Sequence, residues 1–122
     1  MADYELGEVQ SRFADIIWAN EPVSSGELVR LCEAELGWKK STTYTVLRKL
    51  CEKGIFANRD GEVRSLMSRE EFYSRRSELF VQESFGGSLP AFIAAFTSGR
   101  RLSAEDAAQI RRMIEEYEQQ EE

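Results

Sequence analysis

Apolar residues recur at helical spacing from the start of the chain to the first proline. They are Leu6, Val9, Phe13, Ile16 and Ile17. Intervals of three and four residues bring such positions onto one stripe, so the pattern predicts an amphipathic helix with a single buried face. Pro22 is expected to end this helix, because proline disfavours helical backbone in the residue before it.

A second helix is predicted from the residues at its two ends. The segment Ser24-Ser25-Gly26-Glu27 fits the capping-box pattern, with Ser24 as the N-cap. Gly37 is expected to end the helix. The residues that would face inward are Leu28, Leu31 and Cys32.

A third helix is predicted to run to about Lys53, capped by Ser41 or a neighbouring threonine and followed by Gly54. Trp38, in the connection before it, is expected to pack at the helix junction. The inward stripe would be Val46, Leu47, Leu50 and Cys51. The outward face would carry Thr42, Tyr44, Thr45, Arg48, Lys49 and Lys53. One side of this helix is therefore apolar, and the other is cationic and rich in hydroxyl groups.

A β-hairpin is predicted next, since Asp60-Gly61 separates two short runs at residues 55–59 and 62–67. Three more helices follow, each preceded by an expected N-cap. Gly86-Gly87 should end the first of them. The expected caps are Ser68, Ser88 and Ser103. Apolar positions of the first of these helices include Phe72, Leu79 and Phe80.

This order indicates a mainly α fold. Three helices followed by a hairpin is the plan of a winged helix-turn-helix, in which the third helix enters the major groove of DNA and the hairpin, or wing, lies along the backbone. We expect a DNA-binding domain at residues 1–67 and a helical dimerisation domain at residues 68–122. Cys32 and Cys51 fall on inward stripes, so they are interpreted as small core residues.

The apolar helices after the wing need a further surface, because one three-helix core cannot bury them. They would pack either on the amino-terminal domain or against a second copy of the chain, which would form a symmetric homodimer. The homodimer would bury Leu89, Phe92, Ile93, Phe96, Leu102, Ile110, Met113, Ile114 and Tyr117.

Composition then removes several classes of function. The 122 residues are 42% apolar and 31% charged, which fits a compact globular protein. Histidine is absent, only two cysteines are present, and no phosphate-binding glycine loop occurs, so we expect no catalytic residue, metal or cofactor. The longest apolar run, Ala91 to Phe96, is far shorter than a membrane span, and no signal sequence is visible, so a cytoplasmic protein without membrane contact is expected.

The net charge of −6 is unevenly distributed along the chain. Residues 36–67 carry seven basic and three acidic side chains, whereas the segments on either side are both net negative. A positive block over the third helix and hairpin is typical of a surface that meets phosphate. Hydroxyls can approach base edges closely, and cations can reach guanine or the backbone. The candidate DNA-binding residues are Ser41, Thr42, Tyr44, Thr45, Arg48, Lys49, Arg59 and Arg64.

Several stretches of the sequence resemble the penicillinase-repressor family of bacterial transcription factors. They include L-G-E-V-Q-S-R-F-A-D-I-I-W at residues 6–18, G-W-K-K-S-T-T-Y-T-V-L-R-K-L-C-E-K-G at 37–54 and F-G-G-S-L-P-A-F-I-A-A-F at 85–96. The resemblance covers almost the whole chain in the family's order. It implies a dimeric repressor that binds palindromic operators in double-stranded DNA, often those of antibiotic-resistance genes, and it places base-reading residues among Ser41, Thr42, Tyr44 and Thr45.

The chain departs from the family at three places. Ser41-Thr42-Thr43-Tyr44 replaces a Lys-Thr pair followed by Ile or Val and a long polar or basic residue, so a different operator is expected. Family members inactivated by a sensor protease are typically cut between Asn and Phe, and the aligned bond in this chain is Ala95–Phe96. Whether a sensor protease is a partner of this chain is therefore left open by the sequence. The cysteine cluster of the copper-responsive branch is missing, so copper sensing through that cluster is excluded.

The main hypothesis is therefore a homodimeric, sequence-specific repressor without a cofactor. The alternative, from another class, is a winged-helix adaptor that binds a protein and has little affinity for DNA.

Overall fold

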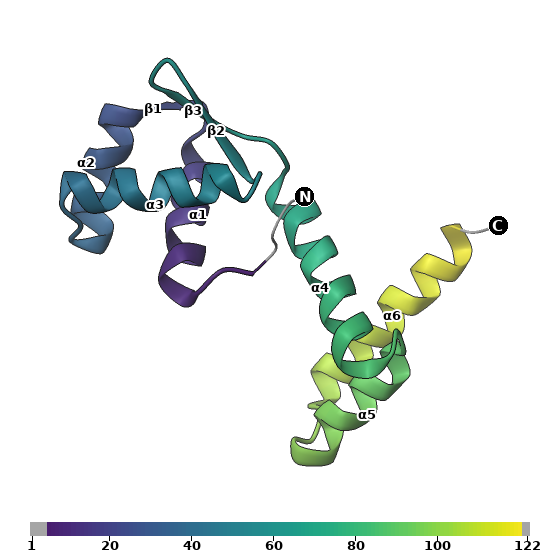
Figure 1. The fold of residues 1–122 in the computed structure, drawn as a ribbon. Coiled ribbons are helices and arrows are strands. Elements are labelled where there is room, and N and C mark those ends of the chain that lie inside the picture. The colour runs from purple at the N-terminus through teal and green to yellow at the C-terminus, as the bar shows by residue number, and fades with distance from the viewer. Residues whose placement is uncertain (1–4, 121–122) are drawn as a thin grey trace. The chain divides into compact units, whose positions relative to one another are not determined.

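The computed structural model describes residues 5–120. Figure 1 shows the elements in chain order, which are α1 (Glu8–Asn20), β1 (Val23–Ser24), α2 (Ser25–Leu36), α3 (Lys40–Glu52), β2 (Phe56–Arg59), β3 (Glu62–Ser65), α4 (Arg69–Phe85), α5 (Leu89–Gly99) and α6 (Ala104–Gln120). The predicted order of helices and hairpin is confirmed, and so is the mainly α fold. Two compact units are present, the first ending at Leu79 and the second beginning at Phe80.

The core of the first unit joins α1, α2, α3, the sheet and the start of α4. Phe13 and Leu28 are fully buried, as are Leu50 of α3 and Val63 of β3. Phe72 of α4 is also fully buried, so the first unit includes the first turns of α4. The remaining members of this core are Leu6, Ala14, Ile16, Ile17, Val23, Cys32, Leu47, Ile55 and Phe56.

The wing belongs to a three-stranded antiparallel sheet in the order β1-β3-β2. Asp60 and Gly61 have φ values of 54° and 83°, the left-handed pair of angles that a tight two-residue hairpin needs. The predicted Asp-Gly turn is therefore confirmed. The strand β1 is too short to be recognised from alternation, and it pairs Val23 with Val63 of β3.

Local sequence signals correctly mark most helix ends. Ser24 Oγ accepts a hydrogen bond from the Glu27 amide at 3.1 Å, and Gly37 ends α2 with a φ of 68°. The expected cap of the third helix is wrong, because α3 begins at Lys40 and its N-cap, Lys39, makes no side-chain capping bond. The inward place given to Val9 is also wrong, since its side chain is 48% exposed while Ala14 is buried.

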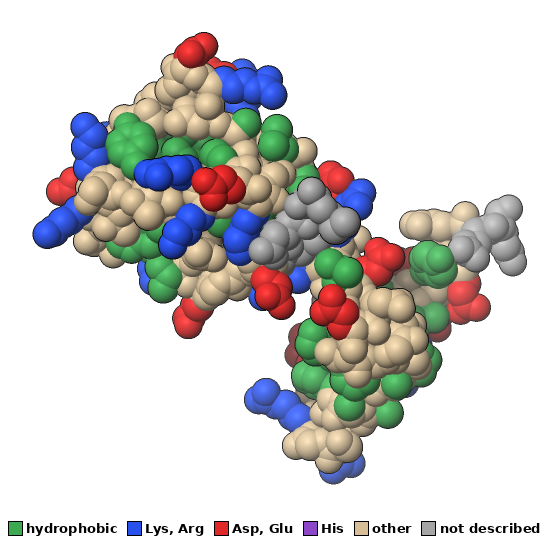
Figure 2. Space-filling view, in the orientation of Figure 1, with side chains coloured by type: hydrophobic (Ala, Val, Ile, Leu, Met, Phe, Trp, Pro, Cys, Tyr) green, Lys and Arg blue, Asp and Glu red, His purple; other side chains and the backbone are tan. Residues whose placement is uncertain are grey.

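The second unit is held by an aromatic cluster. Phe92 of α5 contacts Phe80, Phe85 and Phe96, with ring centroids 5.8, 5.6 and 6.3 Å apart. No side chain of α5 or α6 is fully buried in the single chain, although both helices are rich in apolar residues. Figure 2 shows hydrophobic side chains gathered over this unit. Phe80, the first residue of this unit, is likewise exposed, at 50%, and Leu79 before it is 42% exposed.

Within residues 5–120, no single helix is both long and apolar enough to cross a membrane. The pair α4 and α5 meets the criteria of length and composition only when the two bent helices are taken together.

Candidate nucleic-acid interface

The exposed face of α3 carries most of the predicted contact residues. Thr43, Leu47 and Leu50 turn inward and anchor the helix in the core. Because these residues share one stripe, the opposite face is left to solvent, and Figure 2 shows Lys and Arg side chains over α3. The exposed predicted residues on this face are Ser41, Thr42, Thr45, Arg48 and Lys49.

The hydroxyl of Thr45 is already directed within α3. Its Oγ1 donates a hydrogen bond to the main-chain oxygen of Ser41 at 2.9 Å. The donor of this hydroxyl is therefore committed, while its oxygen can still accept a bond and the γ-methyl group can still make apolar contacts. Those are the groups that contact a cytosine or adenine amino group and a thymine methyl in the major groove.

The amino-terminal end of α3 is suited to an anion. Its first turn has no acidic residue, and its N-cap, Lys39, makes no side-chain capping bond. Each of the other five helices between residues 5 and 120 has a first-turn carboxylate or a serine cap. Lys39 and Lys40 add two exposed positive charges to the positive end of the helix dipole. A phosphate at this end would relieve the repulsion between these charges and the dipole.

Tyr44 differs from the other predicted residues on α3, because it is half-buried. Its hydroxyl donates a hydrogen bond to Ser25 Oγ at 3.2 Å. Its ring lines a pocket of about 320 Å³ between α3 and β2, together with Leu47, Arg48, Cys51 and Asn58. The phenol is thus directed toward the start of α2.

Ser25 and Asn58 are functional candidates that the sequence did not indicate. Asn58 could have been found from the strand period, since it is two residues from the buried Phe56 and therefore shares its face of β2. Ser25 lies beside a stronger signal, the cap Ser24, and tertiary contacts distinguish it, among them the hydrogen bond from Tyr44.

The wing carries the two predicted arginines on one face of the hairpin. Arg59 pairs with Glu62 in the strand register, and Arg64 Nε lies 2.6 Å from Glu62 Oε1. Asp60 adds a second carboxylate at the turn, so residues 59–64 hold as many acidic as basic side chains. The excess positive charge of residues 36–67 therefore lies mainly on α3 and at its two ends.

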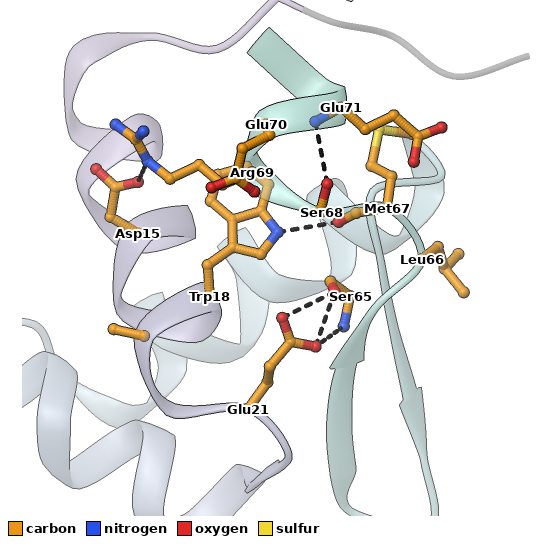
Figure 3. Close-up of a pocket in the computed structure, with 11 residues that line it drawn as sticks. Asp15, Trp18, Glu21, Ser65, Leu66, Met67, Ser68, Arg69, Glu70 and Glu71 are labelled. Atoms are coloured by element: carbon orange, nitrogen blue, oxygen red, sulfur yellow. Dashed lines mark hydrogen bonds and ion pairs between the residues drawn. The ribbon is translucent and has the colours of Figure 1, made fainter. Parts of the chain in front are cut away.

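A joint at the base of the wing holds β3 and the start of α4 against α1 (Figure 3). The Glu21 carboxylate accepts hydrogen bonds from the Ser65 amide at 2.8 Å and from Ser65 Oγ at 2.7 Å. Arg69 lies 2.9 Å from Asp15, whose carboxylate raises the pKa of the guanidinium. The surrounding pocket has a volume of about 710 Å³, and its wall includes Trp18. These bonds restrain the wing relative to the body of the first unit.

Cys32, Cys51 and Trp38 have the structural roles predicted for them. Cys32 is fully buried, and burial raises the pKa of its thiol to about 11. Cys51 is half-buried against the core, and burial likewise raises its pKa. Trp38 stacks on Phe13 with ring centroids 5.3 Å apart at the junction of α2 and α3.

Known proteins resemble this chain over nearly its full length. Two relatives are named methicillin resistance regulatory protein MecI, one from Staphylococcus aureus strain Mu50 and one from Mammaliicoccus sciuri. They are 21% and 20% identical to this chain over 115 residues, which cover 91% of this chain and 94% of each relative. Residues 6–116 match the sequence model of a protein family that is described as penicillinase repressor. With its winged-helix fold and cationic α3, the chain belongs to the penicillinase repressor family of DNA-binding transcriptional repressors.

Proposed function

We propose that the chain is a homodimeric repressor that binds a palindromic operator through α3 and the wing. The observation that carries this proposal is the exposed face of α3, where hydroxyl groups and cations stand together over an apolar anchor. Such a face can supply hydrogen bonds to base edges and charge to phosphates from one helix.

In the proposed complex, α3 lies in the major groove. Thr42 and Thr45 face the base edges, while Arg48 and Lys49 contact guanine or the backbone. The uncapped end of α3, with Lys39 and Lys40, meets a phosphate. Arg59 and Arg64 contribute from the wing, where the neighbouring carboxylates Asp60 and Glu62 reduce their effect.

The second copy is proposed to cover the apolar residues of α5 and α6. Leu89 is 58% exposed, Phe96 47%, Met113 64%, Ile114 55% and Tyr117 62%. A single soluble chain rarely leaves so many large apolar side chains in water on neighbouring helices. A two-fold dimer would bury them and present two α3 helices to half-sites about one helical turn apart, or a multiple of that distance. DNA binding is then assigned to residues 1–67 and dimerisation to residues 68–122, whose first helix, α4, begins in the first compact unit and ends in the second.

The regulated genes are proposed to include an antibiotic-resistance function, as the names of the relatives indicate for those proteins. The test is a mobility shift with the DNA upstream of the chain's own gene, in competition with random DNA of the same length. We expect the upstream fragment to be retained at competitor levels that remove random DNA. Equal competition by both, together with recovery of a stable protein partner, would instead favour an adaptor.

A further inference from the structure

The start of α2 connects α3 to the wing. Ser25 is the first residue of α2, and it is hydrogen bonded both to α3 and to the wing. Its side-chain oxygen accepts from the Tyr44 hydroxyl of α3 at 3.2 Å, and its amide donates to the Gly61 oxygen at 2.7 Å. Three residues from three separate segments thus form a continuous chain of hydrogen bonds.

We propose that Tyr44 is a positioning residue that sets the wing relative to α3 through Ser25. This inference rests on the proposed function, since it concerns how the two DNA-contacting elements are held. It assigns the donor of the Tyr44 hydroxyl to Ser25 and not to a base or phosphate. Two observations support this assignment. The ring is half-buried, and its hydroxyl already donates a hydrogen bond to Ser25.

Gly61, at the turn of the wing, packs closely against Ser25. Gly61 has a φ of 83°, and a Cβ atom at this residue would lie 3.7 Å from Ser25 Oγ. The turn therefore lies close against Ser25. The Ser25 amide is one of the unpaired donors that every helix start exposes, and here the wing carbonyl satisfies it.

The physical consequence concerns the distance between two DNA contacts. A recognition helix in the major groove and a wing on the adjacent backbone bind together only when their spacing matches the duplex. Holding that spacing before DNA arrives lowers the ordering cost of binding. Loss of the Tyr44 hydroxyl should therefore weaken the contribution of the wing and leave that of α3 intact.

The first test combines the variants Tyr44→Phe and Ser25→Ala in a double-mutant cycle of DNA affinity. Each variant is expected to weaken binding about fivefold, as for the loss of one hydrogen bond. The double variant is expected to be no weaker than either single variant, because both remove the same bond. Thr45→Val, which removes a hydroxyl bonded within α3, is the matched control and should be additive with Ser25→Ala.

The second test asks whether the wing is affected. Arg59→Ala should weaken binding less in the Tyr44→Phe background than in the wild type, whereas Lys49→Ala should have the same effect in both. Additive effects of Tyr44→Phe with both Ser25→Ala and Arg59→Ala would overturn the proposal and indicate a direct DNA contact by Tyr44.

A third measurement does not depend on DNA. Hydrogen exchange of the Ser25 amide should be about fivefold faster in Tyr44→Phe than in the wild type, and unchanged in Thr45→Val. An unchanged rate in Tyr44→Phe would overturn the coupling. If the wild type binds no DNA, the proposed function fails, and this exchange rate still decides whether Tyr44 positions the wing.

Discussion

The indole Nε1 of Trp18 donates a hydrogen bond to the main-chain oxygen of Met67 at 3.1 Å. The Trp18 ring also contacts Phe56 and Phe72, at centroid distances of 5.2 and 5.6 Å. One side chain of α1 thus joins β2, the segment after the wing and the start of α4. Its position explains why the first compact unit continues past the wing into α4.

Trp18→Phe should lower the free energy of unfolding of the first unit by about 1–3 kcal/mol, because it removes this hydrogen bond and part of the ring contact. Urea unfolding followed by circular dichroism measures the change. Trp38→Phe is the control, since phenylalanine can keep the stacking on Phe13 and should cost less. A smaller loss of unfolding free energy for Trp18→Phe than for Trp38→Phe would contradict the role given to Trp18.

Lys49→Ala should weaken binding to operator and random DNA by similar factors, corresponding to about 1–2 kcal/mol, because a phosphate contact is not specific for sequence. The slope of log affinity against log salt should fall by about one. Arg75→Ala is the matched control, since Arg75 lies on α4 and pairs with Glu71 at 3.5 Å. An unchanged salt slope for Lys49→Ala would place Lys49 outside the interface.

Thr45→Ala should change which sequences are preferred more than it changes affinity for random DNA. The side chain offers a γ-methyl group and an acceptor oxygen, and alanine has neither. Selection of bound fragments from a random pool compares the two preferences. An identical selected sequence for the wild type and the variant would show that Thr45 does not read bases.

Ile114→Glu should convert a dimer to a monomer, because it places a charge in the middle of the apolar stripe of α6. Sedimentation measures the oligomeric state, and affinity for a two-half-site operator should fall about 100-fold as the linkage between half-sites is lost. Ala108→Glu, on the opposite side of α6, should leave both unchanged. A monomeric wild type would contradict the proposed dimer.

The stability of the first unit should decrease above about pH 9 because of Cys32. Its folded-state pKa is raised from 9.0 to about 11, so the unfolded thiol ionises first and unfolding is favoured as the pH rises through this range. At about pH 10 the wild type should have lost about 1 kcal/mol more than Cys32→Ala, relative to neutral pH. Parallel pH profiles for the two proteins would contradict the burial of this thiol.

Signals that act within a few residues allowed much of the fold to be predicted. The Ser24 cap, the end of α2 at Gly37 and the Asp60-Gly61 turn each depend on the conformation of their own segment. Features that depend on distant contacts were not predicted. The pairing of β1 with β3 and the exposure of Val9 arise from how the elements pack, which periodicity does not contain.

The candidate site shows the same division. Helical spacing correctly separated the exposed Arg48 and Lys49 from the buried Leu47 and Leu50. It could not show that Tyr44 is half-buried and bonded to Ser25, because that contact joins residues nineteen positions apart. It also did not indicate that the carboxylate of Glu62 lies beside Arg64 on the wing.

DNA binding through α3 is tested most directly by the affinity of the wild-type chain for its upstream DNA at graded salt. If α3 and its ends bind phosphates, log affinity should fall linearly with log salt, with a slope of about −0.9 for each phosphate contacted. Several contacts should reduce the affinity by orders of magnitude between about 50 and 200 mM salt, with the upstream fragment preferred over random DNA throughout. An affinity that does not change with salt, or that is equal for both DNAs, would contradict sequence-specific DNA binding through α3.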